Sequence, residues 1–172
     1  MKSIFSKGWV LFVLFSAVLI NCIFTFVLQP VTVSGKSMYP TYHDKQYGFS
    51  LKFKPALDTI ERFDVVVIQN EETEGNYWIK RVIGLPGDYL KFKDNQLYIN
   101  GEKVKEGFLD EDWVKQNLEE FGFFTNDFEI QLTEDEYFVM GDNRPYSSDS
   151  RVIGPVQKED ITSKYVFRVP MT

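Results

Sequence analysis

The sequence predicts a mostly β protein, in which a compact antiparallel β barrel or sandwich carries a small inserted lobe and follows one N-terminal transmembrane helix. The prediction depends on composition, periodicity and one long apolar run. Aromatic residues make up 16% of the 172 residues, and the prevailing Phe and Tyr favour strands over helices. Apolar and polar residues alternate with a period of two in several segments after Pro30. Before that point, residues 9–28 form the apolar run.

This run reads WVLFVLFSAVLINCIFTFVL and contains no charge. A helix rises about 1.5 Å per residue, so this length matches a hydrocarbon core of roughly 30 Å. Lys2 and Lys7 precede it, which favours a cytoplasmic N-terminus (1–8) and places residues 29–172 on the extracellular side of the cell membrane. A cleaved secretory signal would have a shorter apolar region, and a buried core helix would have a polar face. A retained single-pass anchor is therefore the favoured interpretation.

The rest of the chain is interpreted as strands joined by tight turns. Alternation or β-branched runs predict strands over residues 29–33, 47–53, 65–68, 77–85, 137–140 and 165–169. Asp94-Asn95 and Asn100-Gly101 are expected to close hairpins, because these residue types accept the positive φ of a type I′ turn. The inserted lobe is expected near 94–135, with one short helix over 110–121.

Composition excludes several classes of function. A net charge of −6 and a pI near 4.9 argue against a nucleic-acid partner, which requires a basic surface. Cys22 is the single cysteine and His43 the single histidine, so neither a disulfide nor a clustered zinc site is expected. No loop has the spacing of a carboxylate site for a harder cation. We therefore expect no metal and no cofactor, and the sequence does not indicate an oligomeric state.

The first segment with chemical potential is Ser34-Gly35-Lys36-Ser37-Met38-Tyr39-Pro40-Thr41, directly after a predicted strand. A serine in such a turn is exposed and conformationally fixed, as a nucleophile must be. Ser, Gly and Pro also build ordinary turns, so this segment alone favours a plain loop. A serine nucleophile needs a base. His43 is adjacent in sequence to Asp44, but neighbouring side chains of an extended chain point apart, so a solvated loop histidine is the favoured interpretation.

A second possible base lies in Tyr77-Trp78-Ile79-Lys80-Arg81-Val82-Ile83, where strand alternation places Trp78, Lys80 and Val82 on one face. Loss of hydration between apolar neighbours lowers a lysine pKa. Reaching the 7–8 range of a working base from about 10.4 requires roughly 4 kcal/mol, which burial can supply. Judged from this segment alone, a snorkelling lysine whose amine reaches water is favoured.

The segment 141–151 reads GDNRPYSSDSR and follows a predicted apolar strand. Its acidic and basic residues are closely spaced. Such a cluster is either a set of surface salt bridges, which contribute little, or an outer shell that holds a site rigid.

Taken together, these segments resemble the type I signal peptidases, in particular the Gram-positive type with one N-terminal span. The resemblance is carried, in order and spacing, by S-M-Y-P-T around Ser37, F-D-V-V-V-I at 63–68, Y-W-I-K-R-V-I-G-L-P-G-D at 77–88 and G-D-N-R-P-Y-S-S-D-S-R at 141–151. It covers the anchor and these segments, but not residues of about 105–135, where family members vary in length.

The resemblance implies a serine endopeptidase with a Ser–Lys dyad, in which Ser37 is the nucleophile and Lys80 the general base. Ser147 matches the position whose hydroxyl orients the lysine. Structural ion-pair positions of the family are matched by Arg81, Asp142, Asp149 and Arg151. The backbone N–H of Ser37 would be one oxyanion donor. Some members place a serine two residues before the nucleophile as a second donor. That residue is Gly35 here, so Ser34 is the candidate.

The implied substrate is a secreted preprotein that loses its N-terminal signal peptide, with small residues at −1 and −3. It would lie extended along an exposed strand edge, and Met38 and Ile79 match positions that line the −1 pocket. Repressor-type autoproteases also use Ser–Lys, but they are cytosolic and carry a DNA-binding domain, so the anchor and the acidic charge argue against them. A catalytically silent, membrane-tethered binding domain of the same fold remains the alternative.

Overall fold

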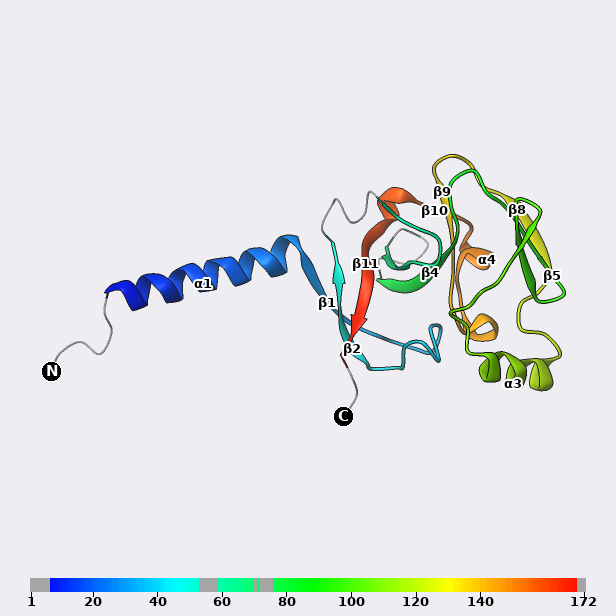
Figure 1. The fold of residues 1–172 in the computed structure, drawn as a ribbon, viewed down its shortest axis with the longest axis horizontal. Coiled ribbons are helices and arrows are strands. Elements are labelled where there is room, and N and C mark those ends of the chain that lie inside the picture. The colour runs from blue at the N-terminus through cyan, green and yellow to red at the C-terminus, as the bar shows by residue number, and fades with distance from the viewer. Residues whose placement is uncertain (1–6, 53–58, 70, 72–75, 170–172) are drawn as a thin grey trace.

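A computed structural model describes residues 7–52, 59–69, 71 and 76–169 of the chain. Figure 1 shows one long helix projecting from a body that consists of two sheets and several short helices. Lys2, the predicted strand end at Phe53 and most of the acidic stretch 70–76 lie outside the described residues.

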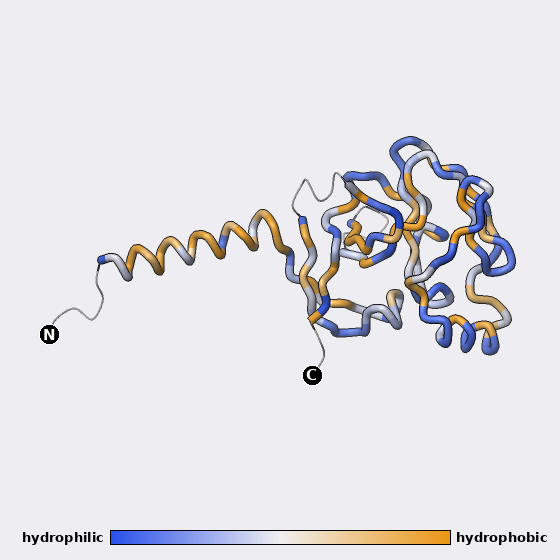
Figure 2. The backbone as a smooth tube through the Cα atoms, in the orientation of Figure 1, coloured by the Kyte–Doolittle hydropathy of each residue, from blue (hydrophilic) through white to orange (hydrophobic). Residues whose placement is uncertain are grey.

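Helix α1 spans Lys7–Phe26, and none of its residues is buried. Figure 2 shows that this helix is apolar along most of its length. Lys7 is the one charged residue among its 20, and the hydroxyl of Thr25 donates to Asn21 Oδ1 at 3.4 Å, which satisfies one polar group within the helix. Its length and composition are sufficient to cross a membrane. An apolar helix that the rest of the protein leaves uncovered is stable in an apolar solvent, as predicted for an anchor.

The larger sheet is antiparallel and contains, among the described residues, the strands β1 (Leu28–Thr32), β2 (Tyr47–Leu51), β11 (Ile161–Arg168), β3 (Val65–Ile68), β4 (Trp78–Gly84), β9 (Glu136–Met140) and β10 (Val156–Gln157), in this spatial order. The mostly β fold and each predicted strand are confirmed, with small differences at the ends. The exception is β11, which begins at Ile161 rather than at residue 165. Its register shifts twice, so burial does not alternate and the sequence period is lost.

The smaller sheet contains, within the described part of the chain, β7 (Glu102–Val104), β6 (Gln96–Ile99), β5 (Tyr89–Lys93) and β8 (Phe128–Gln131). Both predicted hairpin turns are confirmed, because Asp94, Asn95, Asn100 and Gly101 all have positive φ, between 51° and 86°. Together with helix α3 (Glu111–Phe121) this sheet forms a lobe beside the larger sheet. Asp110 caps α3 by accepting a hydrogen bond from Trp113 N at 2.8 Å, as the predicted helix start requires.

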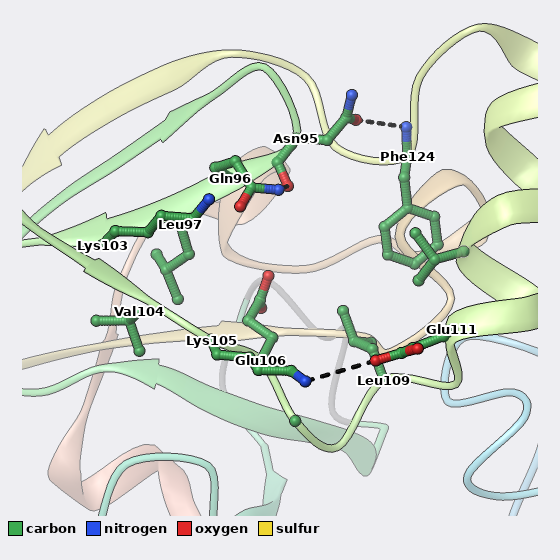
Figure 3. A pocket seen from close by; sticks show the side chains of 12 residues that line it. Asn95, Gln96, Leu97, Lys103, Val104, Lys105, Glu106, Leu109, Glu111 and Phe124 are labelled. Atoms are coloured by element: carbon green, nitrogen blue, oxygen red, sulfur yellow. Dashed lines mark hydrogen bonds and ion pairs between the residues drawn. The ribbon is translucent and has the colours of Figure 1, made fainter.

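A cavity of about 430 Å³ lies inside this lobe, between the β6–β7 hairpin and the first turn of α3 (Figure 3). Asn95 closes one end by accepting a hydrogen bond from Phe124 N at 2.7 Å, and Lys105 pairs with Glu111 at 3.5 Å at the other end. None of the predicted site residues lines this cavity. It is therefore a feature of the lobe and separate from the candidate site.

Three apolar clusters of described residues hold the body together, and one of them supports the predicted nucleophile. Met38, next to Ser37, is 1% exposed and belongs to a cluster with Val33, Tyr42 and Val67. Because Val67 lies on β3, this cluster fixes the turn after β1 against the centre of the larger sheet.

Candidate active site

The turn after β1 brings Ser37 next to Lys80, 43 residues further along the chain. Lys80 lies in β4, opposite Val66 of β3, and is 3% exposed. Its Nζ donates a hydrogen bond to Ser37 Oγ at 3.0 Å. A serine hydroxyl within hydrogen-bonding distance of an amine can lose its proton directly to that amine once the amine is neutral.

The surroundings of Lys80 favour the neutral amine. Burial lowers the pKa of Lys80 from 10.5 to about 8; the negative charge of Asp149 opposes this effect and the positive charge of Arg151 adds to it. The ring of Trp78 covers one side, 5.3 Å from Nζ. The snorkelling geometry that the segment alone favoured is therefore wrong, because the amine ends inside the protein. At pH 7 about a tenth of Lys80 is therefore neutral and able to accept a proton.

The backbone around Ser37 is fixed by Asn143. The N–H of Asn143 donates to the carbonyl of Ser37 at 3.0 Å, and its Nδ2 donates to the carbonyl of Lys36 at 3.0 Å. On the other side of the turn, Gly35 N–H donates to Asp44 Oδ1 at 2.8 Å. Asn143 was not among the predicted site residues. It lies inside the motif at 141–151, but nothing in the sequence indicates that its partner is the turn around residue 37.

The predicted structural charges form two buried ion pairs near the dyad. Arg81 binds Asp142 through two contacts of 2.8 and 2.7 Å, and the hydroxyl of Thr41 donates to the same carboxylate at 2.5 Å. Arg151 binds Asp149 through two contacts of 2.8 Å. The Asp149 carboxylate also accepts from Gly141 N at 2.9 Å. The first pair connects the loop 141–151 to β4, and the second connects two residues within this loop. The interpretation of these charges as surface salt bridges is therefore wrong.

A third buried charge, Arg144, was not among the predicted site residues. Its side chain is inaccessible to solvent, forms an ion pair with Glu106 and donates to the hydroxyl of Thr125 at 3.3 Å. Glu106 and Thr125 belong to the lobe. Arg144 therefore joins the lobe to the loop that carries Asn143.

The structure places the remaining candidates close to the dyad without fixing their roles. The hydroxyl of Ser147 donates to the carbonyl of Ser148 at 3.3 Å, and it lies beside Gly141, as does the carbonyl of Ser37. Ser34 is exposed on the turn.

His43 lies in a loop but is half-buried, and its ring is edge-on to the ring of Tyr39, with 5.2 Å between the ring centres. The expectation of a solvated histidine is therefore wrong.

A groove of about 200 Å³ begins at the dyad. Residues 32–34 and 77–79 line it, together with Ser37, Met38, Lys80 and Ser148. β1 is the edge strand of the larger sheet, and β9 pairs with β4 only from Arg81 onward. Within the described residues, both walls therefore present strand edges that lack a neighbouring strand, as β-strand addition of a peptide requires.

Over residues 7–52, 59–69, 71 and 76–169, no three His, Cys, Asp or Glu side chains gather in a way that could hold an ion.

Comparison with known proteins assigns the family. The family model described as "Signal peptidase, peptidase S26" matches residues 6–170. Signal peptidase I of Bacillus licheniformis is 41% identical over 164 residues, covering 92% of this chain and 87% of that protein. Signal peptidase I S of Bacillus subtilis (strain 168) is 38% identical over 163 residues, again 92% of this chain and 87% of the relative.

A solved structure agrees with this assignment. The crystal structure of a signal peptidase I from Enterococcus faecalis V583 is 34% identical and superposes with a TM-score of 0.56, covering 62% of this chain and 97% of that chain. The chain belongs to the signal peptidase family, peptidase S26.

Proposed function

We propose that the chain is a membrane-anchored serine endopeptidase that removes N-terminal signal peptides from secreted preproteins with a Ser–Lys dyad. The proposal is supported by the family and by the relatives, which are named signal peptidase I. The observation that carries the mechanism is the contact of 3.0 Å between Lys80 Nζ and Ser37 Oγ inside an apolar surrounding. The alternative of a silent binding domain loses its basis, because both dyad positions are occupied and in contact.

In the first half of the reaction, neutral Lys80 takes the hydroxyl proton as Ser37 Oγ attacks the scissile carbonyl carbon. The carbonyl oxygen becomes an oxyanion, which the backbone N–H of Ser37 stabilises, with Ser34 as the proposed second donor. The C–N bond then breaks, and the Lys80 ammonium gives its proton to the leaving amine. In the second half, Lys80 takes a proton from water as the water oxygen attacks the acyl carbon. The ester bond between that carbon and Ser37 Oγ then breaks, and the Lys80 ammonium returns its proton to Oγ, which releases the carboxylate product and restores the serine. One oxyanion donor contributes about 2.7–4 kcal/mol in a well-studied protease.

The residues around the dyad act as positioning groups in this proposal. Ser147 orients the amine of Lys80. Its hydroxyl lies near the carbonyl oxygen of Ser37, because both groups border Gly141. The pair of Arg81 with Asp142 fixes the loop 141–151 to β4, and the pair of Arg151 with Asp149 fixes the loop internally.

The preprotein is proposed to enter the groove as an added strand between residues 32–34 and 77–79. The −1 side chain would lie at Met38 and Ile79, where the groove ends at the dyad. A groove of only about 200 Å³ favours small side chains at −1 and −3.

We place α1 in the cell membrane, with the N-terminus in the cytoplasm and residues 29–172 outside it, because Lys7 lies at its N-terminal end. The enzyme and the signal helix of its substrate then share one membrane. This confinement raises their effective concentration, which compensates for a short and shallow recognition groove.

The test uses the full-length chain in lipid vesicles and one secretory precursor. Wild type is expected to cut at the signal-peptide junction, whereas Ser37→Ala and Lys80→Met are expected to lose at least about a thousandfold in kcat/KM. Lys115→Met is the matched control, because Lys115 is 75% exposed on α3 and should retain activity. Cleavage by both dyad variants would reject the dyad, and no cleavage by wild type would favour the binding role.

A further inference from the structure

The turn that carries Ser37 contributes to two cavities. Ser34, Ser37 and Met38 line the groove described above. Lys36 and Tyr39 line a separate cavity of about 710 Å³. The loop around residue 147 divides in the same way, with Ser148 at the groove and Tyr146 at the larger cavity, which we name the aromatic pocket. Groove and aromatic pocket therefore share no lining residue, although both are built on the turn that carries Ser37.

The walls of the aromatic pocket are mainly aromatic and come from three parts of the chain. The ring of Tyr39 meets Trp113 of α3 edge-on at 4.8 Å, and it meets His43 edge-on at 5.2 Å. Tyr146 completes the wall and is 56% exposed. Rings arranged in this way provide a large apolar surface for a side chain.

Three polar atoms in this wall are buried without a hydrogen-bond partner among the described residues. They are Trp113 Nε1, Asn143 Oδ1 and His43 Nδ1. Because these atoms are inaccessible to solvent, they lie behind the pocket surface, where a bound peptide does not reach them. The surface that the aromatic pocket offers to a ligand is therefore formed by its rings and not by these three atoms.

The aromatic pocket lies next to the turn that carries the nucleophile, although neither Ser37 nor Lys80 lines it. Lys36 precedes Ser37, and Asn143 binds the carbonyls of both residues at 3.0 Å. The groove is lined by residues 32–34 and by the dyad, and the proposed function assigns it to the acyl side of the substrate. An extended chain leaves a cleavage point in the opposite direction at about 3.3–3.6 Å per residue, so positions +1 to +3 lie within about 10 Å of Ser37. The aromatic pocket begins within this reach.

We propose that the aromatic pocket binds the first residues of the mature protein and favours an apolar or aromatic side chain at one of positions +1 to +3. This inference rests on the proposed function and extends it to the leaving side of the substrate. It also assigns the lobe a part in recognition, because Trp113 comes from α3, outside the four sequence motifs.

The experiment measures the preference of the full-length enzyme in lipid vesicles. One precursor has Ala at +1, +2 and +3, and three others carry a single Phe at one of these positions, with the signal peptide unchanged. Wild type is expected to cut the best Phe precursor about tenfold faster in kcat/KM than the all-Ala precursor. Trp113→Ala should reduce this ratio to near one, and Trp113→Phe should retain most of it.

Phe123→Ala is the matched control, because Phe123 is an exposed aromatic of the same lobe that does not line the aromatic pocket. It should retain the wild-type ratio. Tyr146→Ala is a second test with little effect on the core, and it should lower the ratio. A wild-type ratio of one, or an unchanged ratio in both pocket variants, would overturn the inference. Failure of the proposed function looks different, because wild type would then cut none of the precursors or Ser37→Ala would cut them.

Discussion

Arg81 and Asp142 form a two-contact ion pair in which the Arg81 side chain is 8% exposed and the Asp142 side chain 1%. Arg81 follows the proposed base Lys80 in β4, and Asp142 precedes Asn143, which holds the carbonyl of Ser37. The pair therefore connects the strand of the base to the loop that fixes the nucleophile. The distance between the two proposed catalytic atoms depends on this connection.

Asp142→Ala is expected to lower the free energy of unfolding by about 3–5 kcal/mol, because it leaves the buried guanidinium of Arg81 without its counter-charge. The hydroxyl of Thr41 also loses its acceptor. Urea unfolding of the full chain in detergent measures the change. Lys115→Ala is the control, because its ion pair with Glu119 is long, at 3.9 Å, and exposed, so a change within about 0.5 kcal/mol is expected. Equal effects of the two variants would contradict the role of the buried pair.

Lys80→Met is expected to stabilise the protein while it abolishes activity. The folded pKa of Lys80 is about 8, against 10.5 for an unperturbed lysine, so the unfolded state binds the proton more readily. This lowering corresponds to a stability cost of about 3 kcal/mol that is fully present below pH 8 and fades between pH 8 and 10.5. At pH 7 the variant should therefore unfold at higher urea than wild type, and the difference should shrink toward pH 10.

Lys164 provides the contrasting variant for this prediction. It is fully buried too, but its Nζ pairs with Asp64 at 2.9 Å and donates to the carbonyl of Thr59 at 2.7 Å. Lys164→Met removes both contacts and leaves Asp64 without its counter-charge, so it should destabilise the protein by about 3 kcal/mol. If both lysine variants shift unfolding in the same direction, the distinction between a strained and a satisfied lysine is wrong.

Much of the fold could be predicted from sequence because its signals are local. Type I′ turns require particular residues at Asn100 and Gly101, and alternation marks β2 within five residues. The start of β11 could not be predicted, because two register shifts bury Ser163 and Lys164 in succession and hide the period.

The candidate site was predictable only where several motifs could be considered together. Taken separately, the segment around Ser37 favoured a plain loop and the segment around Lys80 favoured a snorkelling lysine. The structure contradicts the interpretation of Lys80, whose amine is buried. Burial of an amine is set by the surrounding strands, which a single strand cannot reveal. Asn143 and Arg144 were missed for the same reason, since their partners lie 107 and 38 residues away in the sequence.

The rate of cleavage should depend on pH through Lys80. Below its pKa of about 8, Lys80 is an ammonium and cannot accept the serine proton, so kcat/KM should fall about tenfold for each pH unit. Arg151→Gln should move this acidic limb to higher pH, because the positive charge of Arg151 lowers the pKa of Lys80. The full profile of wild type and variant between pH 5 and 10 measures the shift. A limb that stays in place or moves to lower pH would contradict the assignment of the base.

Gly141→Ala should impair the site without adding or removing a charge. A Cβ at this position would overlap both the carbonyl oxygen of Ser37 and the side chain of Ser147. The Ser37 carbonyl is already held by Asn143, so making room for this Cβ is expected to displace the turn and with it the nucleophile. A displacement of about 1 Å near a reacting group costs roughly a hundredfold in rate, and this loss should fall on kcat. Gly107→Ala is the control, since a Cβ there meets no atom within 4 Å, and it should cleave the precursor at the wild-type rate. Wild-type kcat in Gly141→Ala would show that the turn adjusts without moving Ser37, and the proposed rigidity of the dyad would then be wrong.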